Sequence, residues 1–126
     1  MRLLLDTHLF LWALDGSLSS KARDVLDSAD DVYVSAASIW EISIKARLGR
    51  LDADPAEIAR QIGLCGFLAL PISLNHAAYV YQLPVPDGDH KDPFDRMLVA
   101  QALSEPLILV TADKQLAKYG AQTVVV

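Results

Sequence analysis

The sequence contains a single cysteine, Cys65, among its 126 residues. One cysteine can form neither an internal disulfide nor a cysteine-based metal cluster, so we expect a protein of a reducing compartment, the cytoplasm. The three histidines, His8, His76 and His90, lack the spacing of metal ligands. We therefore expect them to be structural or exposed, and we expect no zinc site.

Long apolar runs are also absent, although 52% of the residues are hydrophobic. A membrane-spanning helix needs about 20 apolar residues in a row. The N-terminal stretch, MRLLLDTH, reaches a charge too early for a signal peptide. A chain of this length can bury enough surface to fold without cross-links. We therefore expect one soluble domain over residues 1–126, with no membrane segment.

Positive charge is scarce, because 11 lysines and arginines face 16 acidic residues and the net charge is −5. This balance argues against a broadly basic surface for nucleic acid. Any function on nucleic acid must use local basic residues or bound cations. Candidates for contacts with a phosphate backbone are Lys45, Arg47, Arg50 and Lys91, although solvated surface charge explains each of them as well.

Short apolar segments alternate with segments of helical spacing along the chain. We predict strands at 2–6, 32–35, 67–72, 107–111 and 123–126. We predict helices at 7–14, 20–28, 38–49, 55–64, 74–83, 93–103 and 112–120. Wholly apolar strands between helices are typical of a parallel sheet covered on both faces. The pattern therefore predicts an α/β fold, a three-layer α/β/α sandwich with a mainly parallel central sheet.

Four acidic residues stand where this fold would place a site. Asp6 ends the first strand, and Asp113 follows the fourth. Glu41 lies in the first turns of the helix after the second strand, and Asp95 in the first turn of the helix before the fourth. Because parallel strands end at one edge of the sheet, where ligands bind, we predict that these four side chains converge.

Each acid also has a structural explanation as part of a helix start. Ser38 and Glu41 match the S-x-x-E capping box. Asp92 is a good N-cap in front of a proline, and Asp95 would then complement the dipole of the same helix. The two acids that directly follow strands could cap the next helix. Capping does not explain why all four should share one edge, so we favour a site and keep the cap for Asp92.

Converging carboxylates repel one another, and a divalent cation removes that repulsion. A set of oxygen ligands without cysteine or paired histidine selects Mg²⁺ or Mn²⁺ over zinc. Such a cation, held by carboxylates and waters, commonly acts on phosphates. The acidic set therefore indicates phosphate chemistry.

The motifs LLLDTH, SIWE, HKDPFDRMLVAQA and LILVTAD, in this order, resemble the PIN domain over essentially the whole chain. Within that family the sequence is most similar to the VapC-type toxins of bacterial toxin–antitoxin pairs. The resemblance implies a Mg²⁺- or Mn²⁺-dependent endoribonuclease that hydrolyses RNA phosphodiester bonds. It implies that the catalytic and metal-binding residues are Asp6, Glu41, Asp95 and Asp113. His8 stands where many members carry Asn or Ser.

Other residues beside these acids could support the site. Thr7 and Thr111 could orient the ligands, although each also suits a helix cap. Arg96 could hold a phosphate through two hydrogen bonds, or it could pair with an acid such as Asp92. The sequence does not distinguish these two roles of Arg96. The favoured role of Asp92 is the N-cap.

Two helices carry more apolar residues than one packed face requires. The segment 7–14, THLFLWAL, is apolar nearly all round, and Trp40, Ile44 and Leu48 form a second apolar face on the helix after the second strand. Neighbouring helices could cover these faces, or a partner could. The resemblance implies a homodimer and a groove for a cognate antitoxin. We predict that Trp12 or Trp40 lies at such an interface.

Two other functions compete with the ribonuclease. An aspartate-based phosphatase would use Asp6 as its nucleophile, but haloacid-dehalogenase-like enzymes need a second acid where this chain has His8. A non-catalytic binding module of the same fold would not need four mutually repelling charges. Metal-dependent cleavage of RNA separates the three hypotheses.

Overall fold

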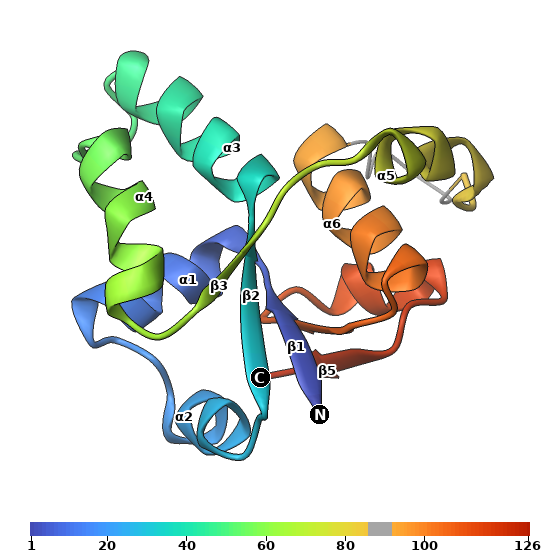
Figure 1. The fold of residues 1–126 in the computed structure, drawn as a ribbon, viewed down its shortest axis with the longest axis horizontal. Coiled ribbons are helices and arrows are strands. Elements are labelled where there is room, and N and C mark those ends of the chain that lie inside the picture. Colours follow the sequence, from blue (N-terminus) through green and yellow to red (C-terminus); the bar gives the residue numbers. More distant parts are fainter. Residues whose placement is uncertain (86–91) are drawn as a thin grey trace.

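A computed structural model describes residues 1–85 and 92–126, and it contains a five-stranded parallel sheet of order β3-β2-β1-β4-β5 (Figure 1). The strands are β1 (Arg2–Leu5), β2 (Asp31–Ser35), β3 (Leu68–Leu70), β4 (Ile108–Thr111) and β5 (Thr123–Val125). All neighbouring strands pair in parallel. The α/β fold with a parallel central sheet is therefore confirmed. The candidates His90 and Lys91 lie outside the described residues.

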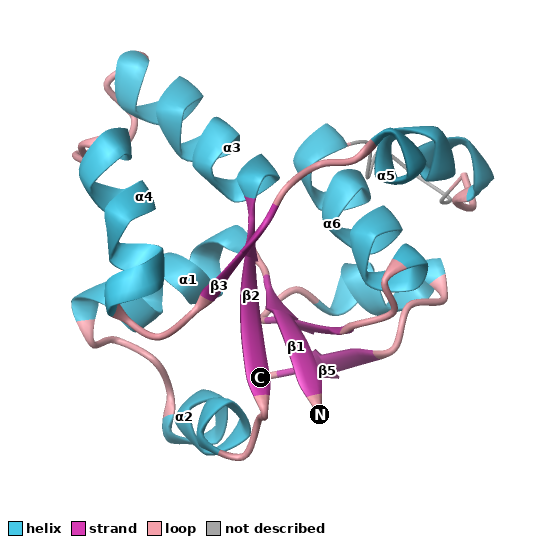
Figure 2. Ribbon diagram, in the orientation of Figure 1, coloured by secondary structure: helices cyan, strands magenta, loops and turns pink. Residues whose placement is uncertain are grey.

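Helices cover both faces of this sheet, as Figure 2 shows. They are α1 (Thr7–Asp15), α2 (Ser20–Asp27), α3 (Ala36–Arg47), α4 (Pro55–Leu64), α5 (Leu74–Tyr79) and α6 (Pro93–Ser104), with the 3₁₀ helices η1 (Val80–Gln82) and η2 (Lys114–Tyr119). In the described parts of the chain, none of the helices is both long and apolar enough to cross a membrane.

The hydrophobic core consists of two layers, one on each face of the sheet. Alternate residues of β1 divide between them, because Leu4 packs in one cluster while Leu3 and Leu5 pack in the other. The first cluster takes Leu98 and its neighbours from α6, and the second takes Phe10 from α1. Successive side chains of a strand point to opposite faces, so a wholly apolar strand is buried on both sides. The three layers are therefore as predicted.

Several element boundaries differ from the prediction. The helix expected at 38–49 begins earlier, at Ala36, and Ser35 is its N-cap, accepting a 2.9 Å hydrogen bond from the backbone N–H of Ala37. The alternative explanation of Glu41, as part of a capping box with Ser38, is therefore wrong, because Ser38 lies inside the first turn of α3. Ser35 can cap the helix because its backbone is still extended as it leaves β2.

Three other segments are shorter or more tightly wound than expected. The third strand covers only Leu68–Leu70 of the predicted 67–72. The helix predicted at 74–83 ends at Tyr79 and continues as the 3₁₀ turn η1. The segment predicted as a helix at 112–120 forms the 3₁₀ helix η2. Short 3₁₀ pieces commonly end or replace helices where few residues are available.

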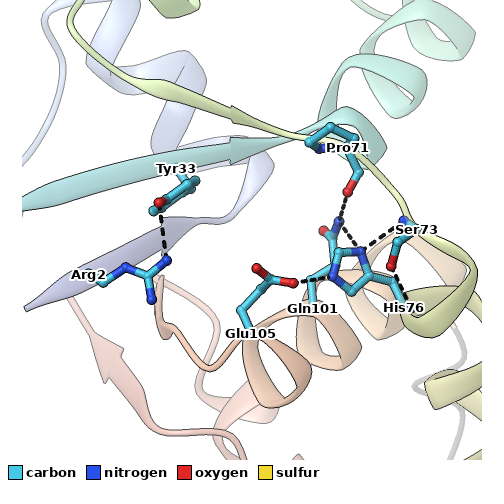
Figure 3. A network of polar contacts seen from close by, with 7 residues as sticks. All are labelled: Arg2, Tyr33, Pro71, Ser73, His76, Gln101 and Glu105. Atoms are coloured by element: carbon cyan, nitrogen blue, oxygen red, sulfur yellow. Dashed lines mark hydrogen bonds and ion pairs between the residues drawn. The ribbon is translucent and has the colours of Figure 1, made fainter.

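A buried polar network joins α5 to α6 (Figure 3). The His76 ring is 3% exposed, and its Nε2 lies 2.6 Å from Oε2 of Glu105. Its Nδ1 accepts a 3.0 Å hydrogen bond from the backbone N–H of Ser73, so the ring proton lies on Nε2. The amide nitrogen of Gln101 lies 3.3 Å from the carbonyl of Pro71. His76 is therefore structural, as expected.

Candidate functional site

The carboxyl ends of the strands meet at a cavity of about 510 Å³. All four predicted acids line it. The described residues on its wall are Asp6, His8, Trp12, Glu41, Lys45, Asp92, Asp95, Ala112, Asp113 and Leu116. Elements that are far apart in sequence supply these residues, namely the ends of β1 and β4 and the helices α1, α3, α6 and η2. The predicted convergence of the acids on one edge of the sheet is therefore present in the structure.

Asp6 is both a helix cap and part of the cavity wall. One carboxylate oxygen accepts a 2.8 Å hydrogen bond from the backbone N–H of Leu9, and the other accepts from the hydroxyl of Thr111. Burial raises the pKa of Asp6, and these two hydrogen bonds offset part of that increase. The carboxylate is therefore held in one orientation.

Thr111 and Thr7 stabilise the site in different ways. Besides donating to Asp6, the Thr111 hydroxyl accepts a 3.0 Å hydrogen bond from the backbone N–H of Asp113. Thr111 therefore joins two of the four acids. The Thr7 hydroxyl donates a 2.9 Å hydrogen bond to the hydroxyl of Ser38, within buried surroundings. Thr7 thus ties α1 to α3 and does not contact a carboxylate of the set directly.

Asp95 has the most perturbed acidity of the four acids. Its pKa rises from 3.8 to about 7. Burial is the largest cause, and repulsion from Asp92, Glu41, Asp6 and Asp113 adds to it. The carboxylates of the cavity are therefore close enough to repel one another, as the prediction required.

Asp92 and Arg96 frame the start of α6. Asp92 is the predicted N-cap, and one of its oxygens accepts from the backbone N–H groups of Phe94, at 2.8 Å, and Asp95, at 3.1 Å. The Arg96 guanidinium donates to the carbonyl of Pro84 at 3.3 Å and lies 5.6 Å from the centre of the Tyr119 ring. The role of Asp92 is thus confirmed, and a phosphate contact by Arg96 stays a prediction.

Glu41 forms an ion pair with a lysine inside the cavity. Its side chain is only 7% exposed, and the Lys45 ammonium lies 2.7 Å from Oε2. The two residues are one helical turn apart on α3, a spacing that brings side chains together. The sequence indicated either a phosphate contact or a solvated surface charge for Lys45, and this ion pair was not predicted, although the i, i+4 spacing of the two charges was a signal for it.

The chemistry of the acidic set fits a hard divalent cation, because it offers carboxylate oxygens without sulfur or paired imidazole. Within residues 1–85 and 92–126, however, no three acidic, histidine or cysteine side chains are close enough to share one ion. Asp6 uses both oxygens in hydrogen bonds, Glu41 is paired with Lys45, and Asp113 caps η2 through the N–H of Gln115. Binding a cation to three of these acids therefore requires some of their side chains to move closer together.

Two aromatic side chains on the cavity wall were not predicted as site residues. His8 and Trp12 lie one turn apart on α1, with ring centres 6.1 Å apart and a tilt of 46°. Burial is the largest influence on the pKa of Asp6 and raises it, whereas electrostatic interaction with His8 lowers it. His8 is exposed, in agreement with the expectation, and it lies beside the acids because it is only two residues after Asp6.

A family model described as the PIN domain matches residues 3–122. The chain belongs to the PIN domain family. No protein with a curated function gives a significant match. Among solved structures, VapBC2 from Rickettsia felis, bound to a DNA fragment from its promoter, is similar with a TM-score of 0.71 and 15% identity, over 100% of this chain and 98% of that one.

Two further solved structures share the fold of this PIN domain. FitAcB from Neisseria gonorrhoeae has a TM-score of 0.66 at 20% identity and covers 96% of this chain and 95% of its own. A toxin–antitoxin complex from Klebsiella pneumoniae has a TM-score of 0.61 at 18% identity, with 97% and 95% covered. At sequence identities of 15%, 20% and 18%, these similarities establish a shared fold.

The PIN domain also exposes the second apolar face of α3. Trp40 is 56% exposed, Ile44 40% and Leu48 60%, whereas Ile42 on the opposite face is fully buried. Trp40 packs edge-on against Phe94, with ring centres 5.0 Å apart. The alternative that neighbouring helices cover both faces of α3 is therefore wrong. A partner on this face stays a prediction.

Proposed function

We propose that this PIN domain is a VapC-type toxin, an endoribonuclease that hydrolyses RNA phosphodiester bonds with Mg²⁺ or Mn²⁺. The observation that carries the proposal is the cavity at the edge of the sheet, where Asp6, Glu41, Asp95 and Asp113 meet. Repulsion among the acids contributes to the raised pKa of Asp95, and a bound cation would offset that repulsion. These four residues would hold the cation.

When bound, the cation would supply positive charge to the phosphate oxygens and acidify a water molecule. The protein itself orients the carboxylates that would bind this cation. Asp6 is fixed by Leu9 and Thr111, so its carboxylate is already ordered before ligand arrives. Asp95 must lose its proton to act as a charged ligand, and near neutral pH only part of the protein has done so, because its pKa is about 7.

The proposal includes two partners besides RNA, a cognate antitoxin and a second copy of the chain. The exposed face of Trp40, Ile44 and Leu48 offers apolar surface for such contacts. A toxin–antitoxin complex is among the similar structures. An antitoxin segment with apolar side chains for this face and a basic residue for the acidic cavity would match both surfaces. An RNA substrate and the lone Cys65 agree with a cytoplasmic protein.

The deciding experiment incubates the purified protein with total RNA, in Mg²⁺, in Mn²⁺ and in EDTA, and maps the cleaved ends. We expect cleavage with either metal and none in EDTA. Asp95→Asn, Asp113→Asn, Asp6→Asn and Glu41→Gln should each reduce cleavage at least 100-fold while the protein stays folded, because each loses a charged ligand at nearly constant volume. Asp24→Asn, on the exposed side of α2, is the matched control and should cleave normally.

The same experiment separates the competing functions. A folded wild-type protein that leaves RNA intact under all metal conditions would support a non-catalytic binding module. Release of phosphate from a small aryl phosphate, abolished by Asp6→Asn, would support the aspartate-based phosphatase. Normal cleavage by folded Asp95→Asn would refute the assignment of the four acids.

A further inference from the structure

Lys45 differs from the other residues of the acidic cavity in the sign of its charge. Five carboxylates line the cavity, and among its described lining residues Lys45 is the only lysine or arginine. Its ammonium contacts one of these acids, at a distance of 2.7 Å from Oε2 of Glu41. The chain therefore carries its own cation at one of the four carboxylates that the proposed function assigns to a divalent metal.

The two ends of this ion pair have different environments. The Glu41 side chain is 7% exposed, whereas that of Lys45 is 41% exposed. Glu41 has little room to leave its place, because its side chain is buried on a helix that packs against α1, α4 and α6. Lys45 has a flexible four-carbon stem and an open path to solvent. If the pair separates, the lysine is the partner that moves.

The contacts of Asp6 show why Glu41 is the exchangeable ligand. The oxygens of Asp6 are held by a backbone N–H and by the Thr111 hydroxyl, and both donors belong to rigid elements. The partner of Glu41 is a side chain that can swing away without any backbone movement. A divalent cation at Glu41 would also repel the Lys45 ammonium a few Å away. The ammonium therefore disfavours binding of a metal at the Glu41 carboxylate.

We propose that Lys45 is a built-in counter-ion that occupies Glu41 until a divalent cation displaces it. This inference rests on the proposed function, because it assumes that Glu41 is a metal ligand. It accounts for an ion pair at Glu41, a carboxylate that the proposed function assigns to the metal. Lys45 is thus a positioning residue that sets the metal concentration at which the site fills.

The direction in which Mn²⁺ affinity changes when the charge of Lys45 is removed distinguishes this role from two simpler ones. If Lys45 competes with the metal, removing its charge strengthens Mn²⁺ binding. If the pair is an ordinary i, i+4 contact on the helix surface, removing it changes helix stability and leaves Mn²⁺ binding unchanged. If Lys45 orients Glu41 for the metal, removing it weakens Mn²⁺ binding.

The test is calorimetric titration of the purified full chain with MnCl₂, for the wild type, Lys45→Met and Lys45→Arg. Arg47→Met is the matched control, because it removes an exposed positive charge two residues along the same helix. We expect Lys45→Met to bind Mn²⁺ about 10-fold more tightly, the size that a unit charge near a divalent ion produces under water-like screening. Lys45→Arg should bind like the wild type, and Arg47→Met should stay within about twofold because its charge is distant and screened.

Unchanged or weaker Mn²⁺ binding by Lys45→Met overturns the inference, as does an equal gain in Arg47→Met. Circular dichroism in EDTA checks the fold of each variant, and Lys45→Gln replaces Lys45→Met if the latter does not fold. A wild-type protein that binds no Mn²⁺ would refute the proposed metal site and this inference with it. Mn²⁺ binding by the wild type that Glu41→Gln weakens, together with an unaltered Lys45→Met, would leave the proposed function standing and refute the role of Lys45 alone.

Discussion

Replacing Asp95 by asparagine should stabilise the metal-free protein at pH 8, although it removes an acid from the first turn of a helix. The pKa of Asp95 rises from 3.8 to about 7 on folding. If the whole change acted on stability, the charged form would cost about 4 kcal/mol. Asp95 is partly exposed, and solvent screening reduces the effect, so we expect a gain of about 1–2 kcal/mol in the free energy of unfolding.

The gain should depend on pH in a specific direction. Because the folded pKa is the higher one, the folded protein binds this proton more readily than the unfolded chain does. The contribution of Asp95 to stability is therefore fully present below pH 3.8 and is lost as the pH rises through about 7. The advantage of Asp95→Asn should be greatest at pH 8 and should disappear near pH 4.

The assay is thermal unfolding in EDTA at a series of pH values between 4 and 8. For a chain of this size, 1–2 kcal/mol corresponds to an increase in Tm of roughly 3–8 °C. Asp24→Asn, on the exposed side of α2, is the control and should leave Tm nearly unchanged at every pH, because it removes an exposed carboxylate that does not line the cavity. A lower Tm for Asp95→Asn at pH 8, unchanged across the pH series, would refute the repulsion argument and leave the helix dipole, worth about 0.3–1 kcal/mol, as the role of Asp95.

Three further outcomes are expected. The affinity of the wild type for Mn²⁺, measured by calorimetry, should increase from pH 6 to pH 8 as Asp95 loses its proton, and a flat profile would contradict a ligand role for Asp95. His76→Ala should lower the free energy of unfolding in urea by about 2–4 kcal/mol, because it opens a cavity and removes the buried partner of Glu105 and Ser73; a loss below about 0.5 kcal/mol would show that the network contributes little. Trp40→Glu should weaken self-association or antitoxin binding in size-exclusion chromatography while RNA cleavage by the monomer persists, and unaltered association would move the interface away from the exposed face of α3.

Much of this architecture was predictable from short stretches of sequence. Apolar segments alternating with helical ones indicated a parallel sheet between two helical layers, and the structure has it. The N-caps at Asp6 and Asp92 were predictable because a cap depends on residues only two or three positions apart. The gathering of the four acids at one edge followed from the parallel order, since every strand then ends on the same side.

Other features depended on contacts between distant segments. Helix α3 begins at Ala36 because Ser35, at the end of β2, is already in position to cap it, which the competing S-x-x-E pattern obscured. The exposure of Trp40 depends on which neighbours pack on α3, and the apolar pattern alone left both faces open. The segment after Asp113 winds as a 3₁₀ helix although its sequence also suits an α-helix.

By itself, the sequence determined the order of elements, the caps at Asp6 and Asp92 and the set of carboxylates, because each of these follows from residues adjacent along the chain or from the rule that parallel strands share an edge. Only the tertiary structure decided the state of those carboxylates. The pKa of Asp95 depends on burial and on the charges of Asp92, Glu41, Asp6 and Asp113, of which only Asp92 is close to Asp95 along the chain. The orientation of Asp6 depends on Thr111, which is 105 residues away along the chain. Electrostatic interaction and desolvation act through distance in space, and that distance is set when the chain folds.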